Sequence, residues 1–187
     1  GSLMVSESRK IAGLLLEGDD DKNFLNKVLA DNLLQKRSPV TAKREARLIL
    51  ARLKGLDKDF WYLVRDGSQE QTIQVLFCAA LKQNRLLGDF VQQVIQTKIK
   101  TFQKEISIQD WQAFFEQCQN LEPAIGKWSE ATRNKVRQVI FKILAQAQII
   151  NSTRGRQLQP FYLIQEIREL LERHNETYIL NCLEIFK

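Results

Sequence analysis

Apolar residues recur every three or four positions along most of this chain, which is the spacing of amphipathic helices. Helix-start signals interrupt the pattern, such as Ser38 before Pro39 and the pairing of Ser68 with Gln71. A serine hydroxyl accepts hydrogen bonds from the free N–H groups of a first helical turn, where proline also fits because it has no N–H. Apolar and polar residues do not alternate over any long stretch, as they would in half-buried strands. We therefore predict an all-α, compact, multi-helix globular protein.

The same pattern predicts the order of the helices. A break is expected at Gly88-Asp89, within a long apolar stretch. The apolar pattern thins out again near residues 100–107, where we place a boundary between an N-terminal helical domain (5–103) and a C-terminal one (104–187). The predicted helices cover 6–16 with Ser6 as its cap, 21–34, 39–53, 57–66, 68–99 in two parts, 107–118, 129–147, 161–173 and 178–186.

Two helix pairs repeat one outline, in which a helix and a short turn lead to a helix rich in basic residues. The first pair joins 21–34 to 39–53, and the second joins the aromatic helix 107–118 to the helix that Ser129 caps. This is the outline of a helix-turn-helix, although plain helical hairpins share it. After the second pair, residues 149–158 place an Arg-Gly-Arg tip between apolar ends, which fits either the small hairpin of a winged helix or a loop.

Positive charge is concentrated in the basic halves of these pairs. The chain carries a net charge of +6. Residues 36–54 hold seven Lys or Arg against Glu45, and residues 127–156 hold seven against Glu130, so each segment alone carries +6. The rest of the chain must then sum to −6. Two cationic segments on an otherwise acidic protein indicate a polyanionic partner.

The helix that Ser129 caps turns apolar residues to one side and amides and cations to the other. Such a face followed by a basic loop suits insertion into a nucleic-acid groove, although a solvated amphipathic helix before a surface loop gives the same pattern. Asn134 and Gln138, four residues apart, are the side chains best suited to pair with adenine edges. The candidate DNA-binding residues are Lys36, Arg37, Lys43, Arg44, Arg47, Arg133, Asn134, Lys135, Arg137, Gln138, Arg154 and Arg156.

Motifs for catalysis or cofactor binding are missing from the sequence, which has no glycine-rich phosphate loop, no HExxH and no CxxC pair. His174 is the only histidine, and it stands on a charged helix end. The three cysteines lie far apart among apolar residues, and the acidic run at 19–21 fits the start of a helix. We therefore predict no catalytic residues, no metal site and no cofactor, and expect that the protein is not an enzyme.

Membrane and export signals are not found either. No apolar run approaches the roughly 20 residues that a membrane helix needs. The N-terminal region has only a six-residue apolar patch, IAGLLL, with charged residues on both sides. We expect a cytoplasmic protein that does not enter the membrane.

Three stretches of the chain, SESRKIAGLLL, DNLLQKRSPVTAKREARLILARL and KWSEATRNKVRQVIFKILAQAQII, resemble the BrxA family, a small core component of BREX phage-defence systems. The resemblance extends over residues 5–186. It implies an all-helical monomer with two helix-turn-helix units, which binds DNA and works beside the methyltransferase and other BREX subunits. One departure is Gln148, which stands where family members have Gly before an apolar pair, so the turn geometry there is open.

Charge and resemblance together predict a non-catalytic DNA-binding subunit of a BREX bacteriophage-exclusion complex. Its two basic patches would bind duplex DNA mainly through the phosphates. The alternative is a protein-interaction adaptor whose basic faces dock on acidic surfaces of other subunits. RNA is a third partner to consider, but the exposed aromatic residues that stack unpaired bases are not evident in the sequence.

Overall fold

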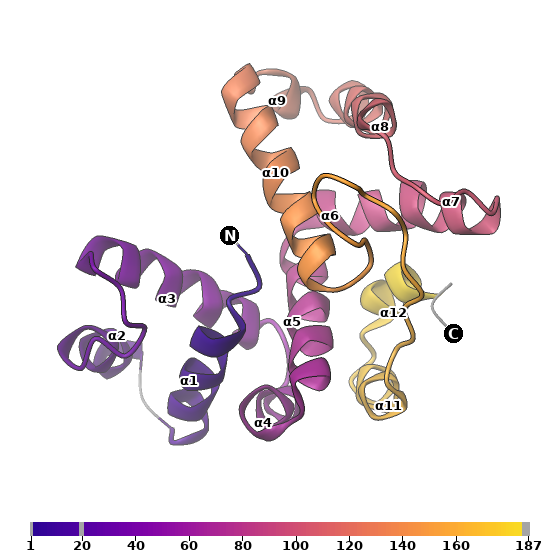
Figure 1. Ribbon diagram of the computed structural model, residues 1–187. Coiled ribbons are helices and arrows are strands. Elements are labelled where there is room, and N and C mark those ends of the chain that lie inside the picture. Colours follow the sequence, from indigo (N-terminus) through magenta and orange to yellow (C-terminus); the bar gives the residue numbers. More distant parts are fainter. Residues whose placement is uncertain (1, 19–20, 185–187) are drawn as a thin grey trace. The chain divides into compact units, whose positions relative to one another are not determined.

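The computed structural model describes residues 2–18 and 21–184. The regular secondary structure of these residues is helical, beside two isolated β-bridges, so the predicted all-α class is confirmed. The helices in Figure 1 are α1 (Val5–Leu16), α2 (Asp21–Ala30), α3 (Pro39–Lys54), α4 (Lys58–Asp66), α5 (Gln69–Gln83), α6 (Arg85–Phe90), the π-helical η1 (Val91–Ile95), α7 (Gln96–Lys100), α8 (Ile108–Leu121), α9 (Pro123–Gly126), α10 (Glu130–Gln146), α11 (Gln165–Arg173) and α12 (Thr177–Leu183).

Contacts within the chain divide it into two compact units. The first unit contains Leu3–Asn84 and Ile164–Leu180, and the second contains Arg85–Leu163 and the residues from Asn181 onward. The predicted boundary between residues 103 and 104 lies inside the second unit. The division into two separately folding domains stays a prediction.

The first unit is built on α5, as the wide apolar face of this helix predicts. Every residue from Val75 to Leu81 is at most 1% exposed. Helices α1, α3 and α4 pack on α5, α2 packs on α3, and α11 packs on α4 and α5 (Figure 1). Helix α11 comes from far along the chain, and its Ile167 and Leu171 are fully buried. The hydrophobic core of this unit therefore needs residues from both ends of the sequence.

An aromatic cluster forms the core of the second unit. The Phe90 ring meets Trp111, Phe114 and Phe141 edge to face, at centroid distances of 5.3, 5.2 and 6.0 Å. This tilted geometry is the one that aromatic pairs prefer. The cluster joins α6, α8 and α10, so the aromatic stripe predicted on α8 is core and not a surface for stacking bases.

Most predicted helix starts are confirmed by their caps. The side chains of Ser38, Asp57, Ser68, Ser107 and Ser129 each accept a hydrogen bond from a backbone N–H in the first turn of the helix that follows. Such caps depend on residues three or fewer positions apart, which is why the sequence predicts them.

Other predicted helix limits are wrong. Ser6 lies inside α1, whose cap position is Met4 in the left-handed conformation (φ 55°). Helix α2 ends at Ala30 instead of residue 34, since Asn32 turns the chain with φ 42°. The chain does not break at Gly88-Asp89, where α6 continues with Gly88 buried inside it.

Helix α11 begins at Gln165 and not at residue 161. The Ile164 N–H, just before it, donates to Gln74 Oε1 at 2.9 Å. This contact spans 90 residues of sequence, and a local pattern does not reveal it. The expectations for the acidic run at residues 19–20 and for Phe186 concern residues outside those that the structure describes.

The end of α10 forms a Schellman turn. Gln148 takes a φ of 60°, and the Ile149 N–H donates to the Leu144 carbonyl at 2.9 Å. This is the bond that closes such a turn, whose left-handed position usually holds glycine. The geometry of a glycine turn is therefore kept although a glutamine stands there.

Within the described residues no helix has both the length and the apolar composition to cross a membrane. Cys78 and Cys182 are buried, and Cys118 is half-buried.

Candidate nucleic-acid interface

The segment after α10 folds back on itself as a short hairpin. Ile150 and Leu158 form an isolated antiparallel bridge, and the Asn151 N–H donates to the Gln157 carbonyl at 2.9 Å. The sequence left residues 149–158 open between a winged-helix hairpin and a loop. The structure gives a hairpin held by single bridges rather than by regular strands.

A third extended segment, just before α8, lies beside this hairpin. The Leu158 N–H donates to the Lys104 carbonyl at 2.8 Å, and the Ile106 N–H donates to the Arg156 carbonyl at 3.0 Å. The Arg156 side chain adds a bond from Nε to the Ile106 carbonyl at 2.9 Å. The hairpin is therefore attached to the residues that lead into α8.

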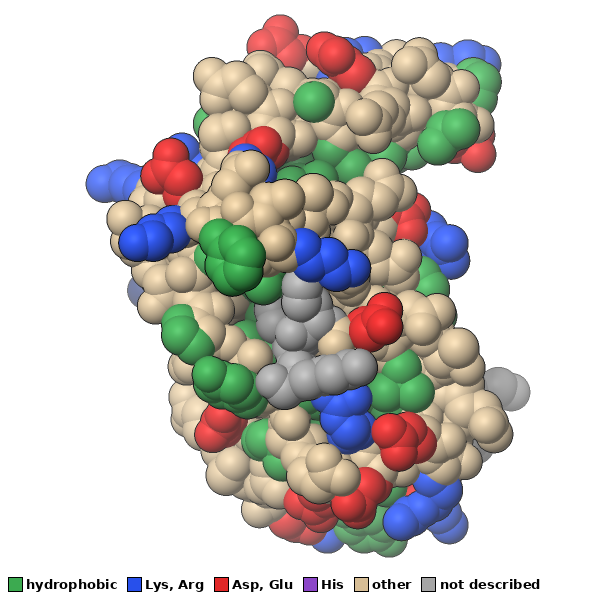
Figure 2. Space-filling model, turned by 90° about the vertical axis from the view of Figure 1, so that its right-hand side faces the viewer, with side chains coloured by type: hydrophobic (Ala, Val, Ile, Leu, Met, Phe, Trp, Pro, Cys, Tyr) green, Lys and Arg blue, Asp and Glu red, His purple; other side chains and the backbone are tan. Residues whose placement is uncertain are grey.

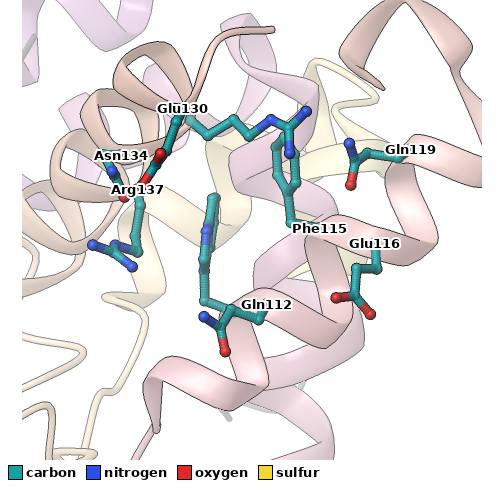
Figure 3. Close-up of a pocket in the computed structure, with 9 residues that line it drawn as sticks. Gln112, Phe115, Glu116, Gln119, Glu130, Asn134 and Arg137 are labelled. Atoms are coloured by element: carbon teal, nitrogen blue, oxygen red, sulfur yellow. The ribbon is translucent and has the colours of Figure 1, made fainter. Parts of the chain in front are cut away.

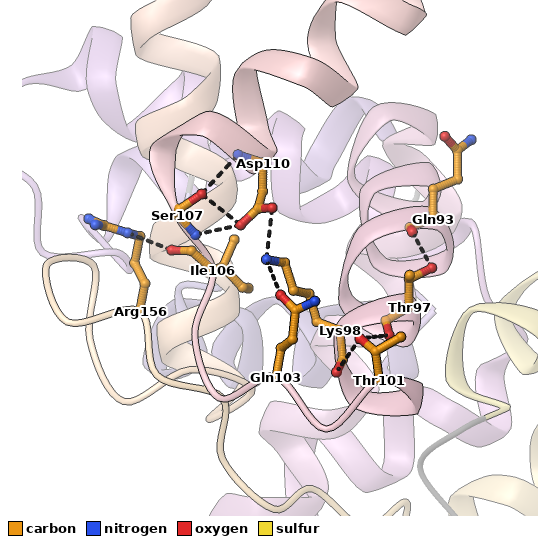
Figure 4. Close-up of polar contacts among 9 residues, drawn as sticks. All are labelled: Gln93, Thr97, Lys98, Thr101, Gln103, Ile106, Ser107, Asp110 and Arg156. Carbon is orange, nitrogen blue, oxygen red and sulfur yellow. Dashed lines mark hydrogen bonds and ion pairs between the residues drawn. The ribbon is translucent and has the colours of Figure 1, made fainter.

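Polar side chains fix the start of α8 in turn (Figure 4). The Asp110 carboxylate closes a capping box with Ser107 and lies 2.8 Å from Lys98 Nζ. Burial acts to raise the pKa of Asp110, but hydrogen bonds from Lys98 and Ser107 bring this pKa below its ordinary value. Because Lys98 belongs to α7, this ion pair connects α7 to the start of α8, from which the hairpin is held.

Gly155 occupies a narrow space at the tip of the hairpin. The Gly155 N–H donates to Ser152 Oγ at 2.8 Å. A Cβ at Gly155 would lie 2.9 Å from Asn151 Oδ1, closer than such contacts normally are. The close turn leaves the Arg154 side chain exposed, while Arg156 follows in a left-handed conformation with φ 48°.

Helix α10 and the hairpin line an open cavity of about 420 Å³, which we call the hairpin-side cavity. It is lined by Ile108, Arg137, Gln138, Phe141, Lys142, Thr153 and Arg156. Three of these residues are cations and none is a carboxylate. Among the residues described, no acidic side chain pairs with Arg137 or Lys142. The hairpin-side cavity is therefore positively charged.

A second cavity of about 370 Å³ lies between α8 and α10, and we call it the α8-side cavity (Figure 3). Figure 3 labels Gln112, Phe115, Glu116 and Gln119 from α8 and Glu130, Asn134 and Arg137 from α10. Two of the lining residues, Glu116 and Glu130, carry negative charge, and they balance the two cations that also line this cavity, Arg133 and Arg137. Because carboxylates repel phosphates, the hairpin side of α10 suits a polyanion better than the α8 side.

The predicted residues of the second basic segment divide between these surroundings. Gln138 and Arg156 line the hairpin-side cavity, and Arg137 lines both cavities. Asn134 is half-buried and lines the α8-side cavity. The two amides chosen for adenine therefore face different cavities. The side chains of Lys135 and Arg154 are exposed.

Arg133 is engaged inside the protein. Its Nε and Nη2 donate to the carbonyls of Trp128 and Gly126, each at 2.9 Å. Its guanidinium also lies over the Phe115 ring, 5.8 Å from the centroid. These contacts hold the end of α9 against α8 and α10.

Lys142 lines the hairpin-side cavity but is not among the residues predicted from the sequence to bind DNA. It stands four positions after Gln138, so the two side chains share a face of α10. The position of the hairpin decides which part of the polar face of α10 borders the hairpin-side cavity. The sequence does not reveal this position, so it could not single out Lys142.

In the first basic segment, Lys36 forms ion pairs with two glutamates. Lys36 Nζ lies 2.7 Å from Glu7 Oε1 and 3.0 Å from Glu45 Oε2. Hydrogen bonds to Glu7 and Glu45 raise the pKa of Lys36 above its ordinary value. The remaining predicted residues of this segment are exposed and make no ion pair with any described residue: Arg37, Lys43, Arg44 and Arg47.

Part of the charge counted in the first segment does not reach the surface. Arg52 is 5% exposed, its Nε donates to Gln83 Oε1 at 3.0 Å, and burial lowers its pKa to about 10. On the face drawn in Figure 2, Lys and Arg side chains lie in small separate groups beside neutral and acidic ones. The net charge of a sequence segment therefore overstates the positive charge that is exposed to a partner.

Comparisons with known proteins cover nearly the whole chain. The sequence model of a family described as BrxA matches residues 1–175. A protein named "BREX protein BrxA" from Paramagnetospirillum magneticum (strain ATCC 700264 / AMB-1) is 36% identical over 185 residues, which cover 99% of this chain and 93% of that protein. One of the same name from Escherichia coli O9:H4 (strain HS) is 33% identical over 184 residues, with coverages of 98% and 86%. A solved structure, "Crystal structure of an uncharacterized protein from Magnetospirillum magneticum", is similar with a TM-score of 0.91 and 34% identity, over 99% of this chain and 95% of that one.

Proposed function

Because the chain belongs to the BrxA family of BREX phage-defence proteins, we propose that it is the non-catalytic DNA-binding subunit of a BREX complex. One observation carries the DNA-binding part of this proposal. Three cations and no carboxylate line the hairpin-side cavity, which borders the exposed face of α10. A surface of this kind attracts phosphates, and duplex DNA carries one negative charge per about 1.7 Å of helix axis.

The order of elements around this cavity supports a winged helix-turn-helix. The helices up to α7 are followed by the extended residues 104–106, then by α8, the short α9, α10 and the hairpin 149–158. We assign α10 as the recognition helix and the hairpin as the wing. In helix-turn-helix proteins the second helix of the pair enters the major groove, which is about 12 Å wide and accepts one helix.

The side chains on this surface divide into phosphate contacts and one base contact. We assign Arg137, Lys142, Arg154 and Arg156 to phosphates, which position the protein without reading sequence. Gln138 is assigned to a base edge, since its amide can pair with adenine. Asn134 faces the α8-side cavity, and Arg133 is used within the fold, so we leave both out of the contact set.

A second DNA-binding surface is proposed on the first unit. Exposed cations without an ion-pair partner among the described residues stand at the start of α3 and along it: Arg37, Lys43, Arg44 and Arg47. Helices α2 and α3 pack against each other, as the helices of the first predicted helix-turn-helix should. Lys36 is left out because Glu7 and Glu45 hold its ammonium.

We also propose that the chain alone is a monomer and that it works in the cytoplasm, where the duplex and the other BREX subunits are its partners. Light scattering after size-exclusion chromatography tests the first statement. A mass well above 21.8 kDa would contradict it.

Gel shifts on duplex DNA over a series of salt concentrations test the proposal. With about four to six phosphate contacts, the logarithm of the binding constant should fall against the logarithm of salt concentration with a slope of about −4 to −5. The double variant Lys142→Glu with Arg154→Glu should bind at least about tenfold more weakly, because two attractive charges become repulsive. Arg44→Glu with Arg47→Glu tests the surface on α3 in the same way.

A matched control reverses two exposed lysines outside both basic segments, Lys58→Glu with Lys100→Glu. It changes the net charge equally and should bind more tightly than either test variant. If both test variants bind duplex DNA as tightly as wild type, the residues assigned to the DNA-binding surfaces are wrong. If the wild-type chain does not bind duplex, but charge reversal releases it from other BREX subunits, the adaptor function is the correct one.

A further inference from the structure

A cluster of possible metal ligands shares no residue with the two basic surfaces. Asp57 caps α4, Asp59 lies in its first turn, and His174 ends α11 at a distance of 115 residues from Asp59 along the chain. One donor atom from each side chain lies within 4.8 Å of the other two. The sequence showed one histidine and scattered acids, and only the packing of α11 on α4 brings them together.

The spacing of the donor atoms suits a small divalent ion. His174 Nε2 is 3.1 Å from Asp59 Oδ2 and 3.8 Å from Asp57 Oδ1. Four ligands placed tetrahedrally at about 2.0–2.1 Å from Zn²⁺ are about 3.3–3.4 Å from one another. These two distances lie on either side of this value, and the third pair of donor atoms lies within 4.8 Å. Small movements of the side chains would therefore bring three ligands to the corners of a tetrahedron.

The chemistry of the donors favours a transition metal. Imidazole nitrogen is a preferred ligand of Zn²⁺ and its neighbours in the periodic table, whereas Mg²⁺ and Ca²⁺ prefer oxygen alone. One imidazole and two carboxylates supply three ligands, and two negative charges balance the charge of the ion. A water molecule would take the fourth position.

The local structure holds the three side chains in place and leaves them accessible. Asp57 Oδ1 accepts the Asp59 N–H at 3.1 Å, which fixes its carboxylate at the start of α4. The ring of Phe60, fully buried, lies 5.7 Å from the His174 ring between centroids and limits its rotation. The His174 side chain is 22% exposed, so an ion can reach it from solvent.

We propose that Asp57, Asp59 and His174 bind one divalent transition-metal ion of the size of Zn²⁺, and that this ion fastens α11 to α4. The site is independent of the proposed DNA surfaces. The competing occupant is a proton, since a protonated His174 between two carboxylates would form ion pairs in the same geometry.

Zn²⁺ titration of the untagged, chelator-treated full chain at pH 7, followed by calorimetry, tests this site. One Zn²⁺ should bind per chain and raise the unfolding temperature. Asp59→Asn and His174→Ala should each weaken binding by more than about tenfold, since even the loss of an outer-shell partner has that effect. Asp66→Asn removes the same charge from the same helix outside the cluster, and it should bind Zn²⁺ like wild type.

Co²⁺ in place of Zn²⁺ identifies the ligands independently of affinity. Tetrahedral Co²⁺ bound by nitrogen and oxygen should give visible d–d absorption without the near-ultraviolet charge-transfer band of cobalt–thiolate bonds. That band would assign the ion to the cysteines and overturn the proposal. Absence of Zn²⁺ binding would leave the proton as the occupant, and unchanged binding by Asp59→Asn, which keeps the histidine packing intact, would also overturn it.

Discussion

The ammonium of Lys36 lies 2.7 Å from Oε1 of Glu7, and so connects the residues before α3 to α1. Its Nζ also approaches Glu45 of α3 at 3.0 Å. Burial acts to raise the pKa of Glu7, but the hydrogen bond from Lys36 and further polar contacts lower it below its ordinary value. A lysine that counts toward a cationic segment in the sequence is thus neutralised within the first unit.

Lys36→Gln should therefore lower stability and spare DNA binding. A partly exposed ion pair contributes up to about 1 kcal/mol, so the free energy of unfolding should fall by about that amount. Arg44, on α3, has no ion-pair partner among the described residues, so Arg44→Gln should leave stability nearly unchanged and weaken DNA binding. Urea unfolding and gel shifts on both variants measure the two effects. Weaker DNA binding by Lys36→Gln at unchanged stability would return Lys36 to the contact set.

Arg133 and Arg137 lie one turn apart on α10. We expect the first to affect mainly the stability of the protein and the second mainly its DNA binding. Hydrogen bonds from a charged group contribute about 1.5–3 kcal/mol, so Arg133→Gln should destabilise the protein by an amount of this order. Arg137→Gln should leave the unfolding free energy nearly unchanged and reduce the salt slope of DNA binding by about 1, as expected for one lost phosphate contact. An unchanged slope would show that Arg137 does not touch the duplex.

Gly155→Ala should disturb the hairpin tip, because the new Cβ would displace Asn151 Oδ1, 2.9 Å away, which accepts the Gln157 N–H. We expect weaker DNA binding and little change in the unfolding midpoint, since the tip is exposed and contributes little to the core. At Gly126 the nearest atom to an added Cβ, outside its own helix backbone, is 3.9 Å away, so Gly126→Ala is the matched control. Equal DNA binding by the two variants would mean that the tip is not used.

Gln148→Gly should stabilise the protein by about 0.5–1 kcal/mol. A left-handed φ costs an L-residue about 1–2 kcal/mol, and glycine avoids this cost but loses about 0.5–1 kcal/mol through its greater freedom in the unfolded chain. Gln148→Ala keeps the Cβ and should show no such gain. Urea unfolding of the two variants compares them directly. A loss of stability in Gln148→Gly would mean that the glutamine side chain stabilises the turn.

Asp110 should contribute stability that disappears in acid. Its pKa in the folded protein is below the ordinary value of 3.8, so the unfolded chain takes up the proton at a higher pH than the folded one. The contribution is complete above that ordinary value and is lost as the pH falls through the lowered value. Asp110→Asn should lower stability at pH 7 and flatten the acid limb. Unfolding measured in urea from pH 7 to pH 2 shows whether it does.

The partner of Asp110 provides a second check. Lys98→Gln should cause part of the same loss, and the double variant should lose less than the two single changes added together, because the two residues share one interaction. Strict additivity would show that the ion pair contributes nothing to stability.

Most of the correct predictions about the fold came from patterns among residues that are close together in the sequence. The capping box of Ser68 and Gln71 and the pairing of Ser38 with Pro39 involve neighbours along the chain, so the sequence contains all of the information. The start of α11 at Gln165 depends on Gln74, and the burial of Gly88 depends on α12, which donates a Cys182 thiol toward its carbonyl. Such contacts between distant residues have no local pattern.

The residues of the candidate site could likewise be predicted only in part, because their partners are distant in the sequence. Charge counting found the two basic segments, but it could not tell that Glu7 holds Lys36 or that the Trp128 carbonyl holds Arg133. It also could not place the hairpin beside α10, which is what distinguishes Gln138 and Lys142 from Asn134. Pairing partners, rather than residue types, decide which cations remain available.

The chain leaves the first unit after Asn84 and re-enters it at Ile164. A ribosome therefore releases α1 to α5 long before it makes α11, whose Ile167 and Leu171 complete their core. During that interval the apolar face that later receives α11 is without its cover, while all of the second unit except its last residues can already fold. Synthesis order thus predicts that the unit begun first cannot complete its core until nearly all of the second unit has been made.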